Sequence, residues 1–295
     1  MKNKKKNFTW SSELTEEAIE FTATELKLAL LATIDHRGWP HLTLITYNRA
    51  KTNNQIVWGQ FTEGLSKKYV IENPKQGILY MNISMPFKFL QIKSDFSHIE
   101  SEGEDLDYFN KLELMRYMTY VRIYKAYYEK VIAATSLRAL PILSIAKGII
   151  KNIIGKGGMK TGFEEKRLDV IGYKIFKGPI NPKFISYIDP SDGYPVILPC
   201  LQLQAVDHNR LIFPLGSALR DDLKKIPQNS NIAVYGANFD LANQMINGIF
   251  TGFKKSRGIT FGIIEIKEVY NSSPPLPGVI YPERRVRPKV TNFSL

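Results

Sequence analysis

The sequence has 295 residues, a length that suggests about two domains. Its 40 basic and 28 acidic residues give a formal net charge of +12, and a hydrophobic content of 44% excludes a disordered chain. A single cysteine, Cys200, excludes a disulfide framework and a cysteine-based zinc or iron–sulfur site, and no apolar run reaches the ~18 residues of a membrane-spanning helix. We therefore expect a reduced, cytoplasmic protein without a metal site.

The first part of the chain predicts short strands separated by tight turns. In residues 41–47, apolar and polar residues alternate with the period of two that is typical of strands. One short helix is predicted at 64–72, and it ends at Asn73 because the following proline drives that residue out of the helical region. This combination indicates a compact antiparallel barrel rather than a doubly wound sheet. The predicted strands are residues 29–34, 41–47, 55–58 and 78–83.

The same order of elements returns 155 residues later. The turn that ends at Pro40 corresponds to the turn that ends at Pro195, and each follows an apolar run that predicts a strand. Matched segments at one spacing indicate two copies of one unit, about 25–100 and about 178–270. The same offset aligns residues 56–58 with 211–213 and 66–71 with 221–226, and 77–80 falls near 232–235.

Between the two copies the composition changes. Residues 106–134 are rich in leucine, tyrosine, lysine and arginine, and we expect them to be helical. After Pro141 a second helix is predicted at 142–154, because its isoleucines recur at helical spacing with Lys147 and Lys151 on the other face. The predicted domains are an N-terminal barrel at 1–103, a helical insert at 104–177, and a C-terminal barrel with an extended tail at 178–295.

Two surface properties bear on partners. The helix at 142–154 is basic and amphipathic, as are helices that lie on membrane surfaces, but we expect it to dock on a neighbouring domain. The net charge of +12 suits nucleic acid. The lysines are dispersed, however, and no nucleic-acid-binding motif is present, so we expect no nucleic-acid partner.

The segment 58–68 carries the most informative chemistry. It leaves a strand, passes two glycines and enters a helix with Ser66 at or near its start. Backbone amides at a helix N-terminus, a hydroxyl group and a lysine such as Lys67 or Lys68 suit a phosphate group. The alternative interpretation is an ordinary connection in which Ser66 is the N-cap and both lysines are solvated.

The chain resembles the pyridoxamine 5′-phosphate oxidase-like, FMN-binding split barrels, in a tandem-duplicated form. The resemblance rests on the order and spacing of 30–40, 58–61, 64–68 and the dipeptide Asn73-Pro74, and it covers the first copy well and the second loosely. It implies that FMN lies against the strands that precede the helix, with its phosphate on the serine and the lysines. The cofactor-binding residues implied by the resemblance are Thr43, Trp58, Gln60, Thr62, Ser66, Lys67 and Lys68.

The second copy departs from this pattern. Asp221 and Asp222 stand where the first copy has Ser66 and Lys67, and two carboxylates would repel a phosphate. Split barrels of this type are typically dimers with flavin at the interface, so the resemblance implies that the second copy is a degenerate partner. The implied fold is mainly β with a helical insert (α+β), in which two tandem split barrels form a pseudo-dimer; a further homodimer stays open.

The insert contains a second candidate site. Arg116, Tyr120 and Tyr124 are four residues apart and share one face of the predicted helix. Arg116 and Tyr120 are the candidate substrate-binding residues, because an arginine holds an anion and an aromatic ring stacks on a flavin. The alternative interpretation is core packing with a surface salt bridge.

Two functions follow from the resemblance. The first is an FMN-dependent oxidoreductase that moves electrons between a reduced nicotinamide, NADH or NADPH, and an unknown acceptor. The sequence has no evident catalytic constellation, which fits this function because the flavin ring carries the redox chemistry. The second is a non-enzymatic protein that binds flavin, deazaflavin or haem as a sensor, carrier or store.

Overall fold

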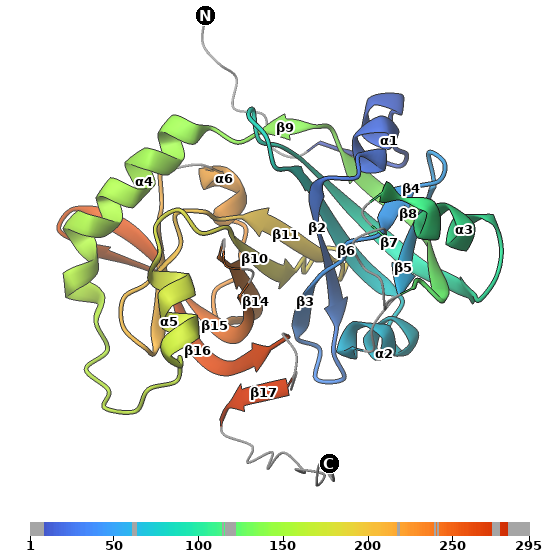
Figure 1. The fold of residues 1–295 in the computed structure, drawn as a ribbon. Helices are drawn as coiled ribbons and strands as arrows, with labels where there is room; N and C mark the ends of the chain where they lie inside the picture. The colour runs from blue at the N-terminus through green and yellow to red at the C-terminus, as the bar shows by residue number, and fades with distance from the viewer. Residues whose placement is uncertain are drawn as a thin grey trace, which may run out of the picture.

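The computed structural model describes residues 9–60, 64–113, 115, 122–216, 219–238, 240, 242–272 and 278–282. It consists mainly of two antiparallel sheets that lie side by side, the first from the blue-to-green part of the chain and the second from the yellow-to-red part (Figure 1). Within these residues, no helix has both the length and the apolar character needed to cross a lipid bilayer.

The two sheets have the same strand order. The first runs β3 (Pro40–Leu44), β2 (Lys27–Ile34), β6 (Lys75–Asn82), β7 (Lys88–Glu100), β8 (Lys125–Thr135), β5 (Gln55–Gln60), β4 (Asn48–Ala50), with β1 (Trp10–Ser11) on β8 and β9 (Arg138–Ala139) on β7. The second runs β11 (Pro195–Pro199), β10 (Lys183–Ile188), β14 (Ser230–Ala237), β15 (Asn243–Ser256), β16 (Ile259–Asn271), β13 (Arg210–Pro214), β12 (Gln204–Ala205), with β17 (Gly278–Tyr281) on β16. Strands β3, β5, β6 and β7 begin 155 residues before β11, β13, β14 and β15, so the predicted duplication is confirmed.

In each sheet, two strands that follow one another in the chain lie at opposite ends of the strand order. In the first, β3 pairs with β2 at one end of the strand order, and β4, the next strand in the chain, pairs with β5 at the other end. Strand β2 is buried on both faces: Ala29 and Leu31 point into the barrel core, whereas Leu30 and Ala32 pack against the second half of the chain. This double burial explains why β2 reads as a continuous apolar run.

The helices lie outside the sheets. They are α1 (Glu16–Ala23), α2 (Leu65–Glu72), α3 (Glu104–Lys111), α4 (Ile142–Gly155), a 3₁₀ helix (Lys156–Met159), α5 (Val170–Lys177) and α6 (Arg220–Leu223). Helix α2 ends before Asn73 and α4 begins after Pro141, as the prolines predict. The four strands predicted in the first copy are also confirmed as β2, β3, β5 and β6.

The predicted helix across 106–134 is wrong over its second half. Residues 125–135 form β8, which lies between β5 and β7 and is essential to the first sheet. Tyr127 and Val131 pack in the barrel core, while Ala126 and Tyr128 pack on its outer surface under α3. Tyrosine and valine also favour strands, and pairing with two distant strands decides the conformation.

The two halves meet along a seam with approximate two-fold symmetry. The Leu42 N–H donates to Met245 Sδ at 3.2 Å, and the Ile197 N–H donates to Gln91 Oε1 at the same distance. The first contact joins β3 to β15 and the second joins β11 to β7, so the two contacts link corresponding pairs of strands. An apolar core that includes Phe89 continues between the sheets, which makes the seam an extensive packed interface.

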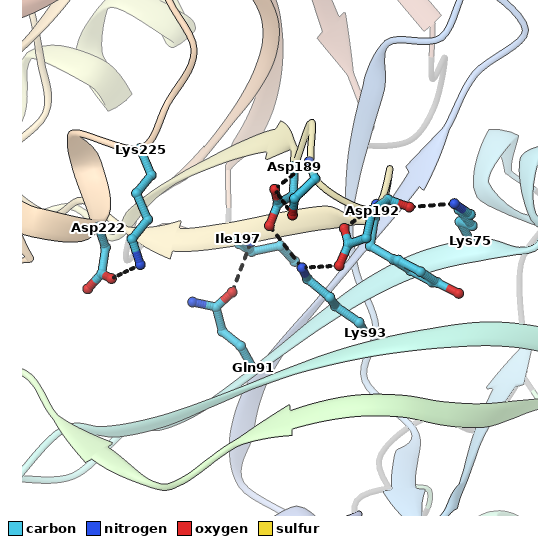
Figure 2. A network of polar contacts seen from close by, with 10 residues as sticks. Lys75, Gln91, Lys93, Asp189, Asp192, Ile197, Asp222 and Lys225 are labelled. Carbon is cyan, nitrogen blue, oxygen red and sulfur yellow. Dashed lines mark hydrogen bonds and ion pairs between the residues drawn. The ribbon is translucent and has the colours of Figure 1, made fainter. Parts of the chain in front are cut away.

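Charged and polar contacts link the two halves of the chain at one edge of the seam (Figure 2). Lys93 of β7 is buried and lies 3.0 Å from Asp189 and 2.7 Å from Asp192, both in the turn between β10 and β11. Lys75 donates to the Asp192 carbonyl oxygen at 2.5 Å. On the equivalent opposite edge, Arg37 contacts Glu268 at 3.2 Å. The turn of each barrel therefore binds a strand of the other.

Candidate functional site

A buried histidine lies at the seam beside α2. His41 of β3 makes edge contacts with two tyrosine rings, Tyr69 of α2 at 5.3 Å and Tyr270 of β16 at 5.4 Å between ring centres. Burial lowers the pKa of His41 to about 4; Asp35 opposes this shift, while Lys67 and Arg37 add to it. His41 is therefore neutral at physiological pH and joins both halves of the chain.

The start of α2 faces this histidine. Gly64 is the N-cap, so the interpretation of Ser66 as N-cap is wrong. Ser66 lies in the first turn, is 2% exposed, and shares a helix face with Tyr69 three residues later. Lys67 is partly buried and its charge acts on His41. A hydroxyl, an ammonium group and first-turn amides thus converge near the seam, a combination that attracts anions.

The structure separates the two adjacent lysines. Lys67 is partly buried, and its charge contributes to the lowered pKa of His41. The Lys68 side chain is 67% exposed and lies 3.6 Å from Glu72 one helical turn later. Only Lys67 of this pair is placed beside the candidate site.

Arg37 adds little positive charge to this region. Its guanidinium binds Asp35 at 2.7 Å and Glu268 at 3.2 Å, so two carboxylates neutralise it. The ion pairs hold the turn between β2 and β3 against β16. Arg37 therefore positions the strand that carries His41 and does not supply an anion site.

Trp58 and Gln60 lie inside the first barrel, and their contact with a cofactor stays a prediction. The Trp58 indole N–H donates to Glu129 Oε1 at 2.5 Å, and its ring stacks on Tyr127 at 4.1 Å. Gln60 accepts a hydrogen bond from the Tyr127 hydroxyl at 2.7 Å and is 1% exposed. The alternation of β5 directs both side chains inward, a direction that the motif alone did not reveal.

Glu129, which accepts the hydrogen bond from Trp58, is a titratable group inside the first barrel. Burial raises its pKa to about 7, whereas hydrogen bonds from Ser94 and Trp58 act in the opposite direction. The Ser94 hydroxyl donates to Glu129 Oε2. The first barrel thus contains a buried carboxyl group whose charge changes near neutral pH.

The structure describes only some of the remaining predicted site residues. Thr43 is partly buried on β3, two residues after His41 and on the same face of the strand. Thr62, Arg116 and Tyr120 lie outside the described residues, so their predicted roles stay predictions. Tyr124, from the same predicted stripe, accepts a hydrogen bond from Gln60 at 2.7 Å, which ties the insert to β5.

At the equivalent place in the second copy the protein supplies its own ion pair. Asp222 lies at the start of α6, is 2% exposed, and contacts Arg138 at 3.1 Å and Lys225 at 3.5 Å. Figure 2 shows the Asp222–Lys225 contact. A carboxylate thus lies where the first copy has an ammonium group.

Sequence reasoning missed His41, Tyr69 and Tyr270 as neighbours. His41 is adjacent to the turn that revealed the repeat, and Tyr69 lies within the lysine-bearing helix, so both were near a signal. Tyr270 had no such signal, because it reaches the site only through the packing of the two halves.

A separate cleft of about 480 Å³ lies between residues 165–169 and 280–282 and shares no residue with the seam site. Among the described residues, no group of three or more His, Cys, Asp or Glu side chains is arranged to hold a metal ion.

No protein-family model and no curated protein sequence matches the chain. Solved structures do match. An FMN-binding protein from Syntrophomonas wolfei subsp. wolfei is 12% identical with a TM-score of 0.36, over 40% of this chain and 82% of that chain. An F420 reductase is 14% identical with a TM-score of 0.34, over 41% of this chain and 98% of that chain. HutZ, the haem storage protein from Vibrio cholerae, is 14% identical with a TM-score of 0.31, over 43% of this chain and 94% of that chain. Each of these matches covers about 40% of this chain.

Proposed function

We propose that the chain binds FMN in the seam beside α2, with the flavin phosphate on Ser66, Lys67 and the first-turn amides of that helix. One observation carries the proposal. A buried hydroxyl and an ammonium group gather beside the neutral His41, at a place where the second copy has the internal pair of Arg138 and Asp222. Opposite charges at equivalent positions indicate that the first copy alone retains an anion site.

The chemistry of the surrounding residues fits a flavin. The rings of His41, Tyr69 and Tyr270 offer flat surfaces that suit an aromatic ring system. Asn247 of β15 is 1% exposed and its Oδ1 atom has no hydrogen-bond partner among the described residues. Asn247 pairs in register with Glu268, which holds Arg37 at this edge of the seam. A buried unpaired acceptor costs about 1–3 kcal/mol, and a flavin carries an imide N–H of the matching kind.

FMN, when bound, supplies hydride-transfer and one-electron chemistry. The residues of the chain bind and orient the cofactor. Ser66 and Lys67 hold the phosphate, and His41 stays neutral because burial lowers its pKa to about 4. We infer an oxidoreductase that takes electrons from NADH or NADPH to an acceptor that the site does not identify.

The absorbance spectrum of the purified protein, before and after incubation with FMN, tests the proposal. We expect a yellow protein whose flavin absorption bleaches with NADH or NADPH under anaerobic conditions. A flavin spectrum that neither nucleotide bleaches would instead support a carrier or sensor, and a Soret band would support haem. Failure to retain FMN after incubation, with FAD and F420 tested in parallel, would overturn the proposal.

A further inference from the structure

Helix α4 presents an apolar face to solvent. Leu143 is 80% exposed, Ile150 56%, Ile153 67% and Ile154 47%. With 3.6 residues per turn, these four side chains fall on one side of the helix. Figure 1 shows α4 at the outer edge of the second half of the chain.

The face that docks on the second barrel has the opposite composition. Its buried residues are Ile145, Gly148, Asn152 and Gly155. Asn152 donates to the Gln202 carbonyl oxygen at 2.5 Å, and a side chain larger than glycine at 155 would collide with the Phe261 ring. The docked face thus buries Gly148, Asn152 and Gly155 beside Ile145, while four branched apolar side chains stay exposed on the other face, although a surface helix usually exposes polar residues there. The predicted docking on a neighbouring domain accounts for one face only.

The orientation of the exposed face is fixed. The β15–β16 hairpin runs beside the end of α4, where the Ser256 hydroxyl donates to the Gly155 carbonyl oxygen at 2.9 Å. Arg257 of the same hairpin donates to the Ile154 carbonyl oxygen at 3.1 Å. These bonds prevent α4 from turning its isoleucines inward without breaking contacts with the barrel.

The surroundings of this face are basic. The stretch 141–163 contains four lysines, Lys147, Lys151, Lys156 and Lys160, and no acidic residue. The stretch 243–264, which includes the hairpin tip, contains Lys254, Lys255 and Arg257 and no acidic residue. Within the described part of the chain, none of these seven side chains is paired with a carboxylate.

We propose that the exposed face of α4, together with the tip of the β15–β16 hairpin, binds the surface of an anionic lipid bilayer. Leu143, Ile150, Ile153 and Ile154 would enter the boundary between headgroups and acyl chains, and the seven basic residues would contact lipid phosphates. A second copy of the chain fits less well, because two such faces would bring fourteen positive charges together without any carboxylate.

Flotation of the full-length protein with phospholipid vesicles tests this surface. We expect binding to vesicles of phosphatidylcholine with phosphatidylglycerol, weaker binding to phosphatidylcholine alone, and loss of binding at high salt. Ile153→Ser should weaken binding at least tenfold, because a branched apolar side chain that enters the bilayer is replaced by a polar one. Lys254→Ala with Lys255→Ala should weaken it about tenfold or more, since each lysine contributes about 1 kcal/mol at an anionic surface.

The matched control is Leu26→Ser in the first barrel. Leu26 is 62% exposed, close to the 67% of Ile153, but lies between α1 and β2. It should bind vesicles as the wild type does. Absence of binding to anionic vesicles, or equal binding by the wild type and Ile153→Ser, would overturn the proposal. So would a concentration-dependent dimer in sedimentation velocity that Ile153→Ser abolishes, because the face would then belong to a second copy.

Discussion

Lys67 and Asp222 occupy equivalent positions in the two repeats, 155 residues apart, and carry opposite charges. Lys67 acts on the buried His41, whereas Asp222 is held by Arg138 from the first half of the chain. Two seam regions that share their backbone thus differ in their chemistry. The pseudo-symmetric fold has one side suited to an anion and one closed by its own ion pair.

The first prediction concerns the phosphate. Lys67→Ala should weaken FMN binding by roughly tenfold to a hundredfold, because a hydrogen bond to a charged group contributes about 1.5–3 kcal/mol. Ser66→Ala should act in the same direction. Isothermal titration with FMN and with riboflavin checks this, since riboflavin has no phosphate and should bind the wild type and both variants alike.

Two controls sharpen this measurement. Lys68→Ala removes the exposed lysine that pairs with Glu72, and Asp221→Ala changes the second copy at the position of Ser66. Both should leave the FMN affinity unchanged. If Lys68→Ala weakens binding as much as Lys67→Ala, the phosphate site is misassigned.

The ion pair in the second copy should matter for stability. Arg138→Ala removes the 3.1 Å partner of Asp222, whose side chain is 3% exposed, and should lower the free energy of unfolding by about 2–3 kcal/mol. Lys225→Ala should cost less than about 1 kcal/mol, because that lysine is 46% exposed and lies 3.5 Å away. Urea denaturation of both variants checks the contrast, and equal losses would contradict it.

Glu129 predicts a pH-dependent stability difference. Burial raises its pKa from 4.5 to about 7, so between these values the folded chain keeps a proton that the unfolded chain has lost. Raising the pH through this window therefore destabilises the wild type, by roughly 3 kcal/mol in total. Glu129→Gln removes the titration while its amide oxygen still accepts from Trp58.

The measurement is the free energy of unfolding of the wild type and Glu129→Gln in urea from about pH 5 to pH 8. The variant should gain relative to the wild type as the pH rises. His41 acts in the opposite sense, because its lowered pKa weakens the fold as the pH falls from 6.5 toward 4. Both proteins contain His41, so its effect cancels in the difference. A difference that is constant with pH would show that Glu129 is ionised in the fold.

The contact between the halves predicts a glycine requirement. A Cβ at position 77 would overlap the Pro195 carbonyl oxygen across the seam, which side-chain motion cannot relieve. Gly77→Ala should therefore cost about 3 kcal/mol. Gly157→Ala is the control, because no atom lies within 4 Å of a Cβ there, and it should change stability by less than about 1 kcal/mol. Thermal unfolding of both variants distinguishes these outcomes, and a Gly77→Ala protein as stable as the wild type would contradict the packing described.

The sequence by itself determined the local elements and the duplication. Apolar runs and one alternating segment predicted the strands of the first copy, prolines predicted the end of α2 and the start of α4, and an offset of 155 residues revealed the second copy. These features depend on neighbouring residues or on comparison of the chain with itself. They can therefore be predicted without knowledge of long-range contacts.

Tertiary structure decided the rest. Residues 125–135 form a strand because they pair with β5 and β7, and Trp58 points inward, where it stacks on Tyr127 in the core of the first barrel. His41 meets Tyr270 from 229 positions away in the chain, and α4 leaves Ile150, Ile153 and Ile154 exposed because Ile145, Gly148 and Asn152 pack on the second barrel. Each outcome depends on which distant surfaces pack together, and a local sequence pattern does not specify those surfaces.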